Sequence, residues 1–186
     1  MQNFNPSSIF FPCPVIMIGT FDQLQKPNLM NAAWGGIYDT NQVFICLDKS
    51  HKTSKNLLNT NEATISFATK ETVRLADYSG CSSSNKQNKF EGIDIKYIKS
   101  DIINAPIFLD FPITLECHLN SFKDENNTLY CVFDILNIKV KDEYVKDNKI
   151  DTSNIDFISF DPALNTYRVI GDSIKKAFNE KEYKND

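Results

Sequence analysis

Strict alternation of apolar and polar side chains over residues 113–119 is the feature that most constrains the fold. The apolar side chains fall on one face and the polar ones on the other: Ile113, Leu115, Cys117 and Leu119 against Thr114, Glu116 and His118. A period of two is typical of a half-buried β-strand. Asn126 and Asn127 suit a tight turn before the long apolar run at 128–140. The pattern predicts a hairpin, with a bulge near Asn137 where the second alternation slips.

Shorter apolar runs elsewhere in the chain predict further strands. They lie at residues 14–21, 30–38, 42–47, 63–68, 93–98 and 157–160, and polar turns at 22–27 and 39–41 separate the early ones. Helical patterns are confined to three short segments, at 53–59, 72–78 and 173–178. Polar or charged residues at 82–88 and 142–154 predict loops. The fold class is therefore mainly β, an antiparallel barrel or meander with a few short helices.

Composition narrows the class of protein. The chain has 186 residues, of which 41% are hydrophobic, and we expect one domain over residues 1–186. A net charge of −4 gives no support for nucleic-acid binding. No secretory signal precedes the first strand, and no run approaches the roughly 20 apolar residues of a membrane span. Five widely spaced cysteines without a CxxC pair are expected to be reduced thiols in a cytoplasmic protein.

One short polar run has the composition of a phosphate site. Ser50 and Thr53 offer hydroxyl donors, and His51 and Lys52 add a ring N–H and a positive charge. A helix that begins near Thr53 would add free backbone N–H groups at its positive end. A capped surface helix with solvated lysines gives the same pattern, so both interpretations stay open. The run is not a glycine-rich phosphate loop, which argues against a nucleoside triphosphate.

A run of small residues beside the single tryptophan comes about a dozen residues earlier, at 28–36. Its small side chains let backbone N–H and C=O groups reach the polar edge of a flat ring. Trp34 would flank such a ring or plug the barrel, and a packed strand with an anchoring tryptophan explains it equally. A flat ring and a phosphate tail together point to flavin mononucleotide (FMN).

Side chains that could carry out chemistry themselves are sparse. His51 and His118 are far apart in the sequence and no further ligand pattern accompanies them, so we expect no metal site. No serine lies in a nucleophile elbow, and Cys81 is expected to be an inert thiol. Glu116 and His118 share a strand face that we expect to be solvated. We therefore assign no catalytic residue, and a bound cofactor would supply the reaction of an enzyme.

Seven short blocks, in order, are similar to those of the flavin reductase-like, FMN-binding split-barrel family, and of its flavoredoxin branch in particular. The blocks are residues 14–20, 28–36, 50–53 with Asn56, 77–80, 89–90, 112–117 and 160–162. The resemblance covers nearly the whole chain, and its most specific block is the run at 28–36. One departure stands out, because Ser83-Ser84-Asn85-Lys86 replaces a Ser-Gly-Arg-Asp found in many related chains. That change affects contacts to a substrate or a pyridine nucleotide rather than to phosphate.

The resemblance implies a split-barrel homodimer with FMN at the subunit interface. It also implies three groups of cofactor-binding residues: Asn31, Ala32, Ala33 and Trp34 along the ring, Ser50, His51, Lys52 and Thr53 around the phosphate, and Tyr78, Ser79 and Gly80 at the border of the site. The first hypothesis for function is a flavin oxidoreductase that accepts hydride from NAD(P)H. The alternative is a non-enzymatic FMN electron-transfer protein, reduced by a protein partner. A third reading is a cofactor-free dimeric barrel for another small molecule.

Overall fold

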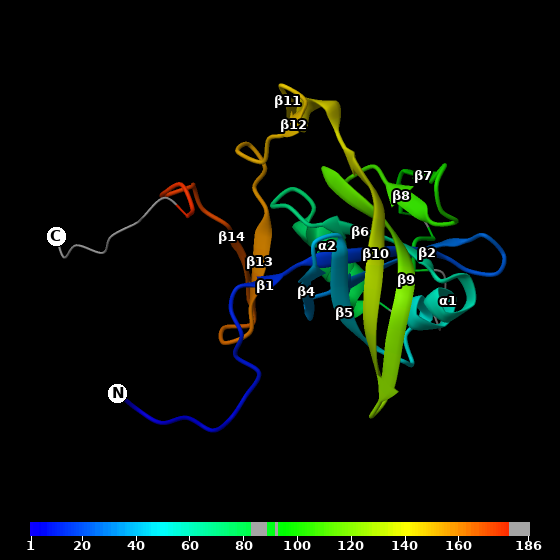
Figure 1. Ribbon diagram of the computed structural model, residues 1–186. Coiled ribbons are helices and arrows are strands. Elements are labelled where there is room, and N and C mark those ends of the chain that lie inside the picture. The colour runs from blue at the N-terminus through cyan, green and yellow to red at the C-terminus, as the bar shows by residue number, and fades with distance from the viewer. Residues whose placement is uncertain (83–88, 92, 179–186) are drawn as a thin grey trace.

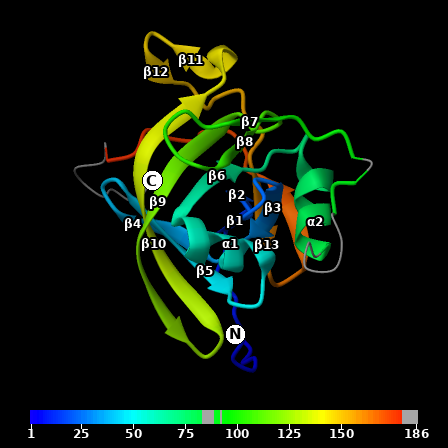
Figure 2. The ribbon, with the colours of Figure 1, turned by 90° about the vertical axis from the view of Figure 1, so that its right-hand side faces the viewer.

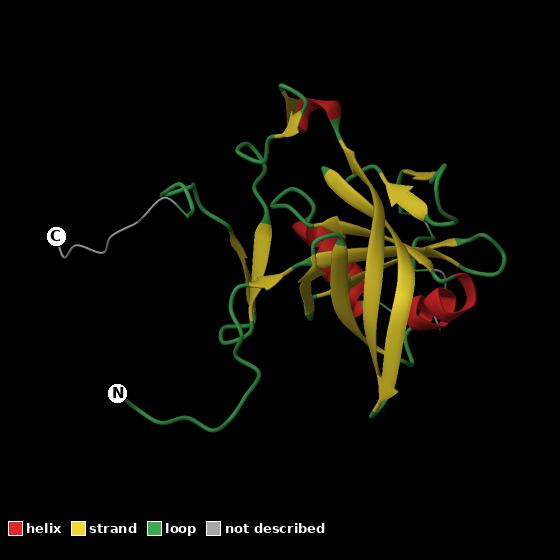
Figure 3. Cartoon of the chain, viewed as in Figure 1, coloured by secondary structure: helices red, strands yellow, loops and turns green. Residues whose placement is uncertain are grey.

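The computed structural model describes residues 1–82, 89–91 and 93–178 (Figure 1). Seven strands form one antiparallel sheet in the order β3-β2-β6-β9-β10-β5-β4. Their bounds are β2 Ile16–Phe21, β3 Pro27–Ala32, β4 Gly35–Asp39, β5 Gln42–Asp48, β6 Glu62–Phe67, β9 Ile113–Glu125 and β10 Thr128–Val140. The sheet curls into a barrel (Figure 2). The predicted fold class, mainly β with few helices, is confirmed (Figure 3).

The long hairpin of β9 and β10 is the centre of the sheet, as the alternating pattern predicts. Asn126 and Asn127 both have positive φ, 50° and 65°, as both central residues of a two-residue type I′ hairpin turn require. The register shifts between Ile135 and Asn137, so the predicted bulge is confirmed. A second shift lies between Val132 and Phe133, which the sequence pattern did not indicate.

The barrel interior and a second cluster outside it bury the apolar side chains. The interior includes Ile18, Ile65, Leu115 and Phe133, all nearly or fully buried. The prediction of a solvated polar face on β9 is wrong at Glu116, which is fully buried, whereas His118 is exposed. Hydrogen bonds explain the difference. The Glu116 carboxylate accepts from the Ser100 hydroxyl and the Asn137 side-chain amide, so a loop covers this face of the strand.

Two short helices flank the edge strand of the sheet, α1 (Lys52–Thr60) and α2 (Val73–Cys81). β3 lies between them in Figure 2, and both helices contact it. α1 packs Leu57 into the barrel core, and α2 packs Ala76 into the second cluster. α1 begins one residue before the start predicted at Thr53, and His51 precedes it. The edge strand β3, the start of α1 and the end of α2 together surround the candidate site.

A second sheet joins distant parts of the chain, in the order β1-β13-β14. Its strands are β1 Cys13–Pro14, β13 Ile158–Asp161 and β14 Thr166–Val169. The predicted strand at 14–21 is therefore split, because the chain passes from this sheet into the barrel at Val15. The predicted strand at 30–38 is also two strands, with Ala33 and Trp34 between them.

Three further predictions need correction. The predicted strand at 93–98 is wrong before Tyr97, and β7 (Tyr97–Lys99) pairs with β8 (Pro106–Phe108). The loop predicted at 142–154 contains a 3-10 turn (η1, Asp142–Tyr144) and a small hairpin, β11 (Val145–Lys146) with β12 (Lys149–Ile150). Residues 173–178 do not form the predicted helix.

The absence of a helix at residues 173–178 has a physical reason. Ile174 and Phe178 are fully exposed, so the segment has no surface against which a helical face could be buried, and so short a helix is not stable alone. The loop predicted at 82–88 lies, apart from Ser82, outside the described residues. In the part of the chain that the structure describes, neither helix has the length and apolar character of a membrane span.

Candidate functional site

A pocket of about 110 Å³ lies where the start of α1, the edge strand β3 and the end of α2 meet. It brings together six of the residues that the sequence predicts for a cofactor site: Asn31, His51, Lys52, Thr53, Ser79 and Gly80. Five more residues complete its lining: Asn28, Met30, Cys81, Ser82 and Lys89. Residues 50–53 and 78–80 are distant in sequence, and only the packing of both helices on β3 makes them neighbours.

The start of α1 is suited to an anion. The first N–H groups of a helix have no partner within it, and the aligned peptide dipoles make this end positive. His51 precedes the helix with extended backbone, at φ −65° and ψ 148°, and its side chain forms no capping hydrogen bond. The first turn contains no acidic residue to neutralise the end. The electrostatic potential is therefore positive on the side of the pocket that the start of α1 forms.

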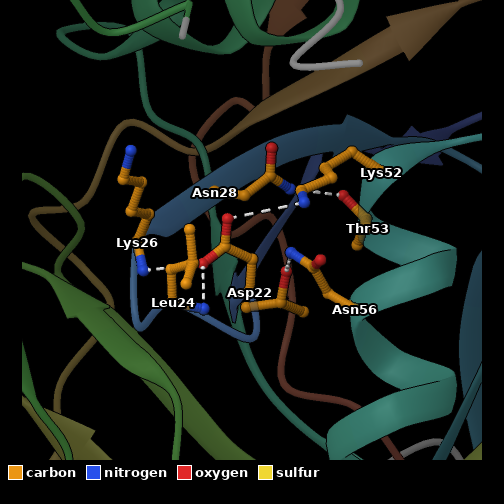
Figure 4. A network of polar contacts seen from close by, with 8 residues as sticks. Asp22, Leu24, Lys26, Asn28, Lys52, Thr53 and Asn56 are labelled. Carbon is orange, nitrogen blue, oxygen red and sulfur yellow. Dashed lines mark hydrogen bonds and ion pairs between the residues drawn. The ribbon is translucent and has the colours of Figure 1, made fainter.

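Thr53 has its hydroxyl fixed within the pocket wall. The Asn28 side-chain amide donates to Thr53 Oγ1 at 2.7 Å, and the Thr53 side chain is buried (Figure 4). Because the oxygen accepts this bond, its own proton stays available as a donor. One turn further along α1, the Asn56 amide donates to the hydroxyl of Thr20 on β2, at 3.0 Å. These two buried amides fix α1 to the edge of the barrel.

Lys52 is held at the pocket by an ion pair. Its Nζ lies 3.4 Å from Asp22 Oδ2, and the backbone N–H groups of Leu24 and Lys26 donate to Asp22 Oδ1, both at 2.9 Å (Figure 4). Partial burial raises the pKa of Asp22, but these N–H groups and Lys52 outweigh it, and the net pKa is lowered. Asp22 therefore stays charged and positions the Lys52 ammonium beside the start of α1.

Lys89 is the main site residue that the sequence analysis did not assign. It is only 4% exposed, and its Nζ donates to the carbonyls of Ser79 at 3.0 Å and Ser82 at 3.4 Å. Burial lowers the pKa of Lys89 to about 8. No carboxylate of the described residues forms an ion pair with it, so an anion in the pocket would supply the missing countercharge. Its one sequence signal is the block at 89–90 in the family resemblance. In the structure, Nζ lies 5.4 Å from the centroid of the Phe90 ring.

Ser79 leaves a buried oxygen without a partner. Its side chain is 1% exposed, and Oγ has no hydrogen-bond partner among the described residues. Burying an unpaired hydroxyl costs about 1–3 kcal/mol, which folded proteins rarely tolerate without a reason. Because Ser79 lines the pocket, a polar ligand bound there would satisfy the hydroxyl. The residues present therefore fit an anionic ligand with several oxygen atoms.

Asn31 connects the pocket to α2 and to β14. Its amide donates to the carbonyl of Ala76 at 3.1 Å and reaches Tyr167 Oη at 3.4 Å, and Tyr167 in turn donates to Asp77 at 3.0 Å. Burial and the bond to Asp77 raise the pKa of Tyr167 to about 12. At Gly80, a Cβ would lie 3.4 Å from Asn31 Cβ, an ordinary contact distance, so α2 packs directly against β3 at this point.

Five of the eleven predicted residues do not line this pocket. Ala33 and Trp34 line a separate apolar hollow of about 300 Å³ together with Phe10 and Phe44. Trp34 is 64% exposed, so the hypothesis that it plugs the barrel is wrong. Ala32 packs against the barrel core instead. Of the residues predicted along the ring, Asn31 therefore lines the first pocket, whereas Ala33 and Trp34 line the second hollow.

Ser50 and Tyr78 form hydrogen bonds at the margin of the pocket. The Ser50 hydroxyl donates to Asp48 Oδ1 at 2.6 Å, and this bond with the Ser50 backbone N–H lowers the pKa of Asp48. The Tyr78 hydroxyl donates to the carbonyl of Lys89 at 2.7 Å. Ser50 thus orders the turn before α1, and Tyr78 fixes the segment that carries Lys89. Residues 83–86, where the chain departs from the related pattern, lie outside the described residues.

Comparison with known proteins identifies the family. The model of the flavin reductase-like domain matches residues 8–155, so the chain belongs to that family. The structure is similar to flavoredoxin of Desulfovibrio vulgaris (Miyazaki F), with a TM-score of 0.90, 26% identity and coverage of 98% of this chain and 100% of that chain.

Two more distant structures share the fold. An FMN-binding protein from Thermus thermophilus has a TM-score of 0.79 at 12% identity, covering 95% of this chain and 97% of that one. An NADH:FAD oxidoreductase of Streptomyces globisporus has a TM-score of 0.69 at 13% identity, covering 87% of both chains. The search of curated proteins finds no match.

Proposed function

We propose that the protein is an FMN-binding flavin oxidoreductase and that the flavin phosphate binds at the start of α1. The convergence of groups in one pocket carries this proposal. The free end of α1, the Lys52 ammonium, the buried Lys89 and the unpaired Ser79 hydroxyl all line it. A phosphate dianion needs several donors and positive charge together, and this pocket supplies both.

We place the isoalloxazine ring along the backbone of residues 31–34, whose side chains reach both hollows at Asn31 and at Ala33 and Trp34. The small side chains of Ala32 and Ala33 leave that backbone accessible. Gly35 has a different reason to be small, since a Cβ there would lie 2.7 Å from the carbonyl oxygen of Phe44 on β5. When bound, FMN supplies the redox chemistry, taking hydride from NAD(P)H and passing electrons to an acceptor. The protein binds and orients it, which agrees with the absence of an assigned acid or base.

A second copy of the chain completes the site in this proposal. Four apolar side chains are exposed on β4 and β5 and the link before them: Trp34, Ile37, Tyr38 and Phe44. Ile37 is 85% exposed, and large apolar side chains exposed together on an edge strand and its neighbour are typical of a protein interface. We therefore propose a homodimer through this face, in the cytoplasm, where its five unpaired cysteines stay reduced.

A second candidate function is FMN-dependent electron transfer without nicotinamide oxidation. The similarity to flavoredoxin, over nearly the full length of both chains, favours it. In this case a protein partner reduces the flavin. FMN retention would be equally tight, and the same pocket residues would hold the phosphate.

Anaerobic reduction distinguishes the two functions. The purified protein should bind FMN with a visible absorption band, and NADH or NADPH should bleach that band if the protein is a reductase. Bound FMN that stays oxidised with both nucleotides would exclude the reductase and leave the electron-transfer function. A protein whose melting temperature ignores added FMN would exclude both, since a ligand specific for the folded state must stabilise it.

A further inference from the structure

Cys81 is the cysteine of this chain that a reagent in solution can reach. All five cysteines lie among the described residues, and the other four are buried or half-buried. Burial raises the pKa of Cys117 and of Cys131 to about 12, which keeps these two thiols unreactive. Cys81, in contrast, is exposed at the last position of α2. A reagent that attacks thiols should therefore select it.

The place of Cys81 in the fold distinguishes it from an ordinary surface thiol. It lines the same pocket of about 110 Å³ as His51, Lys52 and Lys89, where we propose that the flavin phosphate binds. The sequence alone predicts an inert thiol at this position, because it does not show that the end of α2 meets the start of α1. A group attached to Cys81 would occupy space that the phosphate needs.

A second observation, made on a different side chain, indicates that this end of α2 takes a ligand. Ser79, two residues before Cys81, is 1% exposed, and its hydroxyl has no partner among the described residues. A ligand with several oxygen atoms would satisfy that hydroxyl. Phosphate is one such group, and the carboxylates of a small anionic disulfide are another. In so small a pocket the two exclude each other.

Positive charge beside Cys81 determines which reagents are favoured. Lys89 Nζ donates to the carbonyls of Ser79 and Ser82, which lie on either side of Cys81 in the chain, at 3.0 and 3.4 Å. This ammonium lies at the end of α2, where the aligned peptide dipoles are otherwise negative. When no phosphate is bound, the same charge should attract an anionic reagent to the thiol and repel a cationic one.

We propose that Cys81 is a site of reversible modification by an anionic disulfide of low molecular weight, and that this modification and FMN binding exclude each other. The inference rests on the proposed function, because it concerns regulation of the same pocket. A transient disulfide of this kind is compatible with a cytoplasmic protein whose cysteines are otherwise reduced.

The chemical step is thiol–disulfide exchange. Cys81 gives its proton to solvent, and the thiolate attacks one sulfur of the reagent. A sulfur–sulfur bond to Cys81 forms as the bond within the reagent breaks, and the other half of the reagent leaves as a thiolate with the electron pair of the broken bond. Cys81 is thereby oxidised and the departing half is reduced. An added thiol reverses the exchange and restores free Cys81.

Reaction rates test the site and its charge preference. The probes are glutathione disulfide, which is anionic, and cystamine, which is cationic, and each rate is divided by the rate with a free cysteine peptide. Mass spectrometry of the intact chain and of its peptides follows the modification of flavin-free protein. Glutathione disulfide should react at Cys81 roughly tenfold faster than cystamine, and Lys89→Met should remove most of this preference. FMN at about ten times its dissociation constant should slow the reaction about tenfold, since only the free pocket reacts.

Fluorescence titration with FMN tests the consequence. Wild type modified by glutathione disulfide should bind FMN at least about tenfold more weakly, and a thiol reductant should restore the affinity. The FMN affinity of Cys81→Ser should not respond to the disulfide. Cys46→Ser is the matched control, because Cys46 is half-buried on β5 outside this pocket. This control should lose FMN affinity on treatment as the wild type does.

The outcomes separate this inference from the proposed function. If bound FMN leaves the rate at Cys81 unchanged, if the anionic reagent is not preferred, or if the modified protein binds FMN as tightly as the untreated protein, the inference is wrong while the proposed function stands. Modification of another cysteine in place of Cys81 refutes it equally. If the untreated wild type binds no FMN, the proposed function fails and this regulation fails with it.

Discussion

Ser79→Ala should have opposite effects on the flavin-free protein and on flavin binding. The Ser79 hydroxyl is buried and has no partner among the described residues, so folding removes its hydrogen bonds to water and no protein group replaces them. Removing such a group relieves a cost of about 1–3 kcal/mol, less about 1 kcal/mol for the small space left behind. We expect the flavin-free variant to be as stable as the wild type or up to about 2 kcal/mol more stable.

FMN affinity should change in the other direction. If the hydroxyl bonds to the ligand, its loss costs about 0.5–1.5 kcal/mol, a roughly twofold to tenfold rise in the dissociation constant. Urea unfolding of flavin-free protein measures the first effect and fluorescence titration with FMN the second.

Ser54→Ala is the matched control for this experiment. Ser54 is equally buried, but its hydroxyl donates to the carbonyl of Asp48 at 2.7 Å. The control should therefore lose about 1 kcal/mol or more of unfolding free energy. If Ser79→Ala loses as much stability as Ser54→Ala and binds FMN normally, the Ser79 hydroxyl has a structural partner and the reasoning about the pocket is refuted.

Three further predictions concern the phosphate pocket and the proposed dimer. Lys52→Ala combined with Thr53→Ala should weaken FMN binding by about 1.5–3 kcal/mol for each charge-assisted bond lost, and unchanged affinity in a titration would place the phosphate elsewhere. Burial lowers the pKa of Lys89 to about 8, so its charge is lost above that pH and FMN affinity should fall. Between about pH 8 and 10.5 the unfolded chain therefore holds more protons than the folded one, and the unfolding free energy of the flavin-free protein should rise with pH through this group. Lys89→Met should abolish both the fall in FMN affinity and this rise in stability. Ile37→Glu should convert a dimer to a monomer in light scattering, and an unchanged mass would move the interface to another face.

The sequence predicted those parts of the fold in which one local pattern suffices. β9 and β10 followed from alternation and from Asn126 and Asn127, whose positive φ values are those that asparagine tolerates best. β14 was missed because its four residues are mostly exposed and form no pattern of their own. The predicted end of α2 at residue 78 is three residues short, since a helix that contains Gly80 is held by packing against β3.

The candidate site shows the same division. His51, Lys52 and Thr53 could be predicted as one group because donors and charge gather in a run where a helix starts. Lys89 could not, because its importance depends on burial and on the carbonyls of Ser79 and Ser82, which only the tertiary structure brings to it. The prediction of a solvated face at Glu116 is wrong for a related reason. Alternation with a period of two does not indicate whether a distant loop covers one face of the strand.

The affinity ratio of FMN to riboflavin tests the central claim most directly, because the two ligands differ only in the phosphate. Two charge-assisted contacts, from Lys52 and Lys89, would contribute about 3–6 kcal/mol, so we predict that FMN binds roughly 150-fold to 20,000-fold more tightly. Fluorescence titration at pH 7 measures both constants on one preparation. Equal affinities would mean that the pocket at the start of α1 holds no phosphate.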